Sequence, residues 1–175
     1  MPIKILSTLC VFYHVLATVA TIAGAYHLLC MALGRQTFGP VWKHALRNGE
    51  LHLWISGVLI VGIGLYSNGW AYLQNPKLWT KVCLIAVWGI NSLLIKAYLQ
   101  KVSLDARSVF FGISLASLLY GTFLGVAKPL ANGVVPFPAL LLGYLLTIVT
   151  CATAMHRLFK APPGAPGPFA TAALT

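Results

Sequence analysis

The chain has 175 residues, of which 59% are hydrophobic and 8% are charged. Water-soluble domains carry roughly 25% charged residues, so this composition excludes a soluble globular protein and indicates an integral membrane protein. The formal net charge is +10, from twelve Lys and Arg residues against Glu50 and Asp105. The basic residues fall in short stretches between apolar runs, which is typical of membrane loops. We therefore expect the lipid bilayer as the partner, and no nucleic acid.

Five apolar runs are long enough to cross a bilayer, since ~20 residues at ~1.5 Å each span the ~30 Å hydrocarbon core. We expect helices, because a helix satisfies its own backbone hydrogen bonds in lipid. The expected spans are 6–33, 51–72, 78–99, 108–127 and 139–159. Residues 35–50 read as a loop that ends in the turn signal Asn48-Gly49. The sequence predicts one all-α bundle over 1–160 and a disordered Pro/Gly-rich tail over 161–175.

The basic residues predict how the bundle is oriented. With five spans the two termini lie on opposite sides, and eight of the twelve basic residues fall on the side of the C-terminus: Arg35, Lys43, Arg47, Lys96, Lys101, Arg107, Arg157 and Lys160. Positive loops face the cytoplasm, so we expect the C-terminus inside and the N-terminus outside a bacterial inner membrane. Ala23-Gly24-Ala25 resembles a signal cleavage site, but the apolar run is too long for a signal core. We expect a permanent span.

The first span has no charged residue, yet it carries polar side chains along one face. At ~100° per residue this face gathers Ser7, Cys10, His14, Thr18 and Thr21. Polar groups at membrane depth face protein or a cavity, which makes His14 a candidate site residue and a candidate metal ligand.

His27 lies thirteen positions after His14, ~20 Å along the axis and on a different face. Ala20, Ala23 and Gly24 are its neighbours there, and we expect this small-residue surface to admit another helix or a flat ring. Two histidines at this spacing resemble the haem-ligating pairs of membrane cytochromes b. A second site would combine His27 with His52 or His156 as axial ligands of haem iron. The structural alternative is that these histidines lie at helix ends or at the interface.

Lys81 stands in the first turns of the third span, at the same expected depth as His14. Its ammonium could snorkel to the membrane interface. Alternatively it could hold a carboxylate, such as a haem propionate, near His14.

The order of these features resembles a known group of membrane proteins. A first helix with a histidine precedes a Gly-rich helix and a third helix that opens NPKLWTKVCLIAVWGINSLL. This order is similar to the HemJ-type protoporphyrinogen oxidases and to the related copper-resistance protein D family. The resemblance covers about residues 6–127 and implies a four-helix core, to which this chain adds a fifth span. It also implies haem b as cofactor, with His14 and Lys81 at the positions that matter for haem binding in the HemJ type.

The alternative functions are a non-enzymatic structural component and a copper or small-solute transporter. Thiolate and thioether groups suit Cu(I), and they recur at the inner ends of two spans. These clusters are Cys30, Met31 and His27, and Cys151, Met155 and His156. No catalytic residue is assigned, and a homo-oligomer stays open. With no Asp or Glu expected inside a span, a carboxylate-driven pump is not expected.

Overall fold

The computed structural model describes residues 2–33, 39–99, 101–127 and 134–161. It contains five helices that are long and apolar enough to cross a membrane, which confirms the predicted all-α, multi-pass architecture. The elements are α1 (Pro2–Ala32), α2 (Pro40–Asn68), the 3-10 helix η1 (Gly69–Gln74), α3 (Pro76–Tyr98), α4 (Leu104–Val126) and α5 (Phe137–Lys160). Most of the predicted disordered tail, 162–175, lies outside the described residues.

The predicted loop 35–50 is wrong over residues 40–50, because α2 begins at Pro40. Proline has a fixed φ that suits the first turn of a helix. Its missing N–H costs nothing there, because an N–H in the first turn has no partner within the helix. The Asn48-Gly49 pair makes no turn. Gly49 instead allows α1 and α2 to touch, since a Cβ at this position would lie 2.8 Å from Thr21 Oγ1. Glu50, expected in a loop, therefore lies within α2, a helix long and apolar enough to cross a membrane.

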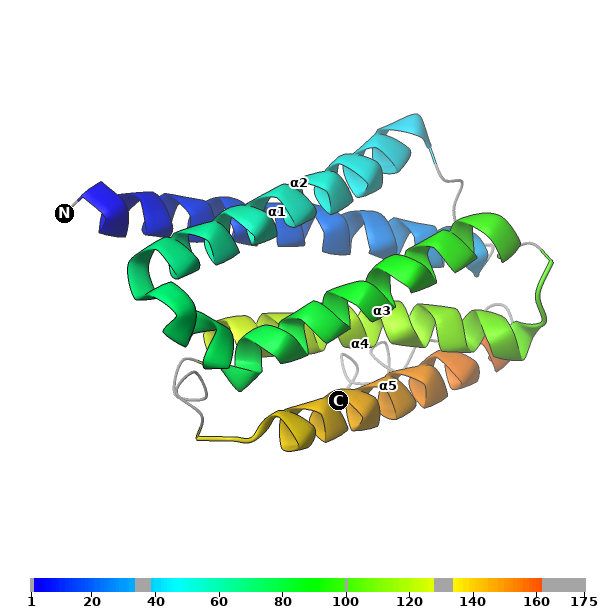
Figure 1. Cartoon of the computed structure of the whole chain (residues 1–175). Coiled ribbons are helices and arrows are strands. Elements are labelled where there is room, and N and C mark those ends of the chain that lie inside the picture. The colour runs from blue at the N-terminus through cyan, green and yellow to red at the C-terminus, as the bar shows by residue number, and fades with distance from the viewer. Residues whose placement is uncertain (1, 34–38, 100, 128–133, 162–175) are drawn as a thin grey trace, which may run out of the picture.

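The helices form two units (Figure 1). One unit is the antiparallel α1–α2 hairpin, and the other consists of α3, α4 and α5, with η1 joining them. Gly69, at φ +57°, ends α2 in a backbone conformation that glycine adopts readily. No Cα atom of α2 comes within 8 Å of one in α3 over the described ranges, so side chains alone bridge these two helices.

Small residues set the closest helix contacts. A Cβ built at Gly24 would lie 2.7 Å from Leu46 Cβ, so the small-residue face of α1 admits α2 as expected. In the other unit, a Cβ at Gly112 would lie 2.5 Å from the Ala152 Cα. The Gly121/Gly125 pair, the obvious small-xxx-small motif of the sequence, makes no such approach, and Gly125 has no neighbour within 4 Å.

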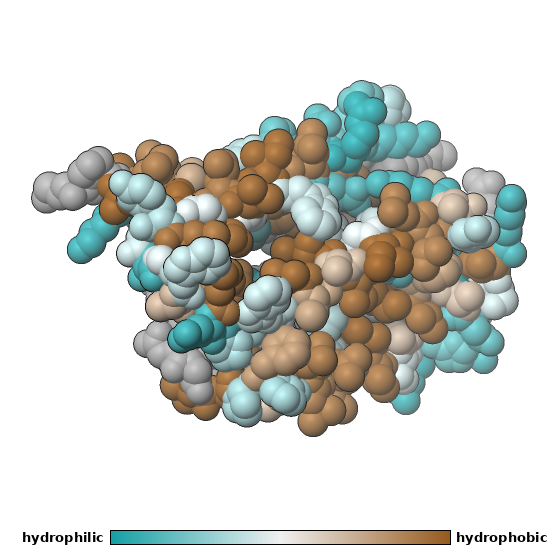
Figure 2. Space-filling model, viewed as in Figure 1, coloured by the Kyte–Doolittle hydropathy of each residue, from teal (hydrophilic) through white to brown (hydrophobic). Residues whose placement is uncertain are grey.

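The buried core belongs to the three-helix unit. Its members are Leu84, Ala116, Tyr120, Leu124, Leu140, Tyr144 and Cys151. Both tyrosine hydroxyls have partners, because Tyr144 shares a 2.7 Å hydrogen bond with Ser117 and Tyr120 donates to the Leu140 carbonyl at 2.7 Å. Elsewhere large apolar side chains are exposed along the flanks of the helices, as lipid contact requires. Figure 2 shows these flanks, and hydrophilic residues gathered toward the end that holds the start of α2.

Candidate functional site

The polar face of α1 is directed toward protein, as predicted. All five of its side chains are at least partly buried, and Thr21 is fully buried, whereas the neighbouring Leu9, Phe12 and Val15 are exposed. His14 lies in the middle of this face and meets α2 at Ser56. Its ring nitrogen Nδ1 is 2.8 Å from the Ser56 hydroxyl oxygen.

The hydrogen bonds of the Ser56 hydroxyl bear on which nitrogen of His14 carries the proton. Ser56 Oγ lies 2.7 Å from the His52 carbonyl and 3.1 Å from the Leu53 carbonyl, to which it donates its one hydrogen. With its hydrogen directed to these carbonyls, Ser56 accepts from His14, and Nδ1 is then the protonated nitrogen of the neutral ring. The lone pair then lies on Nε2, which has no hydrogen-bond partner in the part of the chain that the structure describes. A neutral imidazole held in this way is suited to bind a metal ion.

Lys81 approaches the same place from α3. Its ammonium lies within electrostatic range of the His14 ring, although the two residues belong to different units. One turn earlier, Lys77 Nζ donates to the Ala127 carbonyl at 2.9 Å and so joins the start of α3 to the end of α4. The Lys81 charge thus acts on His14 across the two units, and it has no acidic partner among the described residues.

The other histidines lie apart from one another. The Tyr13 hydroxyl forms a hydrogen bond with Nδ1 of His52, and the two rings meet edge to face at 5.7 Å. His27 instead stacks on the indole of Trp42, with ring centroids 3.5 Å apart. Trp42 of α2 thus lies against the His27 ring on this side of α1. His27 and His52 have different ring partners, and the structure does not bring them together.

At the ends of the other helices, His156 Nδ1 lies 3.2 Å from an Asp105 carboxylate oxygen and ties α5 to α4. His44 bonds locally, with Nδ1 2.8 Å from the Pro40 carbonyl. Across the described ranges, no three His, Cys, Asp or Glu side chains gather as a metal site would need. The two Cys/Met/His clusters of the sequence therefore gain no further ligand of this kind.

Sequence reasoning missed a cleft of about 630 Å³ between the hairpin and helices α3 and α4. Basic side chains at its rim come from the start of α2, the end of α3 and the α3–α4 connection, namely Lys43, Arg47, Lys96 and Lys101. Apolar and small polar side chains line the rest, among them Thr21, Leu28, Leu46, Trp88, Ser92 and Leu118. Figure 2 shows a hollow between the two units.

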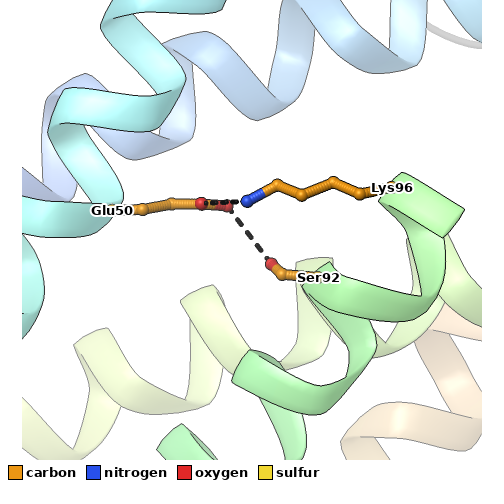
Figure 3. Close-up of polar contacts among 3 residues, drawn as sticks. All are labelled: Glu50, Ser92 and Lys96. Carbon is orange, nitrogen blue, oxygen red and sulfur yellow. Dashed lines mark hydrogen bonds and ion pairs between the residues drawn. The ribbon is translucent and has the colours of Figure 1, made fainter.

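Glu50 crosses this cleft and bridges the two units (Figure 3). Its carboxylate accepts a 3.2 Å hydrogen bond from Ser92 and pairs with Lys96 at 3.0 Å. The Glu50 side chain is 15% exposed and that of Lys96 is 59% exposed. A helix start at Pro40 would have placed Lys43, Arg47 and Glu50 on one helix face, since they then recur at i, i+4 and i+7, but not their partners on α3.

Comparison of the chain with protein-family models, with curated proteins and with solved structures finds no match.

Proposed function

We propose that this multi-pass membrane protein binds b-type haem, with His14 as the ligand of the iron. The observation that carries the proposal is the orientation of the His14 ring. Its Nδ1 lies 2.8 Å from the Ser56 hydroxyl oxygen, and with Nδ1 as the donor the lone pair of Nε2 is available for a metal. Histidine ligands of metals almost always donate their other ring N–H to such a partner, which fixes both tautomer and orientation.

The surroundings of His14 suit an acidic, largely apolar cofactor. The Lys81 ammonium, near the ring, would pair with a propionate carboxylate. Among the described residues, no Cα atom of α1 or α2 lies within 8 Å of one in α3, so only side chains lie between the hairpin and α3. Haem would supply one-electron redox chemistry, while the protein would set the axial ligand and the polarity around the iron. The resemblance of the first three helices to the HemJ type supports the same two residues.

An absorbance spectrum of the protein, purified in detergent from haem-replete cells, tests this proposal. We expect a Soret band that His14→Ala removes and that Ser56→Ala shifts or weakens. His27→Ala is the matched control, since it removes a histidine from the same helix that stacks on Trp42 instead.

A folded, colourless wild-type protein would refute the haem proposal, and so would a Soret band that survives in His14→Ala. Copper measured in the same preparations, at a stoichiometric level and without haem, would favour the transport alternative instead. Size-exclusion elution and helical circular dichroism show whether each variant is folded.

A further inference from the structure

The cleft at the basic end of the bundle is separate from His14, which does not line it. We propose that this cleft binds the headgroup of an anionic phospholipid, with the upper part of an acyl chain against its apolar wall. This inference goes beyond haem binding and does not depend on it.

The charge of the rim indicates that the ligand is an anion. Four basic residues, Lys43, Arg47, Lys96 and Lys101, converge from three segments, and Glu50 is the one acidic residue in the lining. Like charges repel unless an anion sits between them, so a cluster with this excess of positive charge favours an anionic ligand. Lysine and arginine together are the usual partners of phosphate oxygens.

The wall of the cleft indicates that the ligand also has an apolar part. Below the rim it is formed largely by apolar side chains, including Leu28, Leu46, Trp88, Ile95 and Leu118. A free inorganic anion would gain nothing from this surface, whereas a lipid can bury part of a chain there. The volume of about 630 Å³ falls within the ~300–1,000 Å³ typical of ligand sites.

The position of the cleft identifies the lipid class. It lies at the end of the bundle where the basic residues concentrate, which the positive-inside rule predicts to be cytoplasmic. That leaflet carries anionic lipids, and basic pockets between membrane helices bind their headgroups. The cleft opens between α2 and α3, and the rim residues Lys43, Arg47 and Lys96 are exposed.

Glu50 acts as an internal counter-ion in this scheme. Its carboxylate holds Lys96 at 3.0 Å and accepts from Ser92 at 3.2 Å, which are contacts that a lipid phosphate could make. An incoming phosphate would compete with Glu50 for both donors. Removal of the carboxylate should therefore strengthen lipid binding, whereas removal of the rim cations should weaken it.

The test measures lipid binding to the full chain by native mass spectrometry, with phosphatidylglycerol and phosphatidylcholine of matched acyl chains. We expect the wild type to prefer phosphatidylglycerol. Lys43→Gln/Arg47→Gln should weaken that binding by about 10-fold or more, since each basic residue near an anionic lipid contributes about fivefold. Arg157→Gln/Lys160→Gln is the matched control, because it removes two exposed charges at the inner end of α5, away from the cleft.

Glu50→Gln tests the proposal in the opposite direction from Lys43→Gln/Arg47→Gln. A folding defect could explain a loss of lipid binding, but it cannot explain a gain in affinity for the lipid. We expect it to bind phosphatidylglycerol several-fold more tightly than the wild type. Three results would overturn the proposal. They are equal binding of the two lipids by the wild type, an equal loss in the α5 control variant, and displacement of phosphatidylglycerol by millimolar inorganic phosphate or by haem.

Discussion

Replacement of Gly112 by Ala should separate α4 from α5 and destabilise the protein. A Cβ at Gly112 would lie 2.5 Å from the Ala152 Cα and 2.6 Å from its backbone nitrogen. Because both are backbone atoms, no change of rotamer can relieve the clash, and the helices must part by about 1 Å to reach normal contact. Overpacking of this kind costs ~1–3 kcal/mol, and alanine recovers up to ~1 kcal/mol through its better helix propensity. The expected net loss of unfolding free energy is about 1–2 kcal/mol.

Unfolding in mixed micelles, with a rising fraction of denaturing detergent and helical circular dichroism as the readout, measures this loss. Gly57→Ala is the matched control, since Gly57 also lies inside a helix and a Cβ there would have no neighbour within 4 Å. We expect the control to be as stable as the wild type or slightly more stable. If Gly112→Ala matched Gly57→Ala, the close contact of α4 with α5 would not exist as described.

Three further expectations concern other contacts. Tyr144→Phe removes the 2.7 Å hydrogen bond to Ser117 and should lower the unfolding free energy by about 1 kcal/mol, whereas Tyr66→Phe, at an exposed site, should have no effect in the same assay. Lys77→Met removes the donor to the Ala127 carbonyl and should destabilise by ~1–2 kcal/mol, and an unchanged transition would show that this bond contributes nothing. A fluorescent protein that folds only in the cytoplasm should fluoresce when fused after α5, and a phosphatase that works only in the periplasm should be inactive there. The reverse pattern would contradict the positive-inside count.

The five helices could be predicted because hydropathy is a local property of the sequence. The direction of the polar face of α1 could also be predicted, since a period of 3.6 residues fixes which side chains share a face. The first turns of α2 could not, because Asn48-Gly49 is a turn signal in isolation. The glycine serves instead to let Thr21 approach, and this reason exists only once α1 lies alongside.

Partners across helices were harder to predict than faces. Nothing local in the sequence sets the register of α1 against α2, so the pairing of His27 with Trp42 and of His52 with Tyr13 appeared only in the structure. For the same reason, sequence alone does not show that Gly112, and not Gly125, makes the close contact with α5. The residues that line the cleft come from each of the helices α1 to α4, so no single stretch of sequence indicates the cleft.

The bridge from Glu50 to Lys96 also has a consequence for the order in which the chain assembles. The two residues are 46 positions apart, so the carboxylate leaves the ribosome about 2–9 s before its ammonium partner at ~5–20 residues per second. During this interval the Glu50 carboxylate lacks its ion-pair partner, and insertion that carried it past the headgroup level into the hydrocarbon layer would be unfavourable. The hairpin should therefore stay near the interface, or beside the insertion machinery, until α3 emerges. Glu50 thereby couples the final placement of the first two helices to the synthesis of the third.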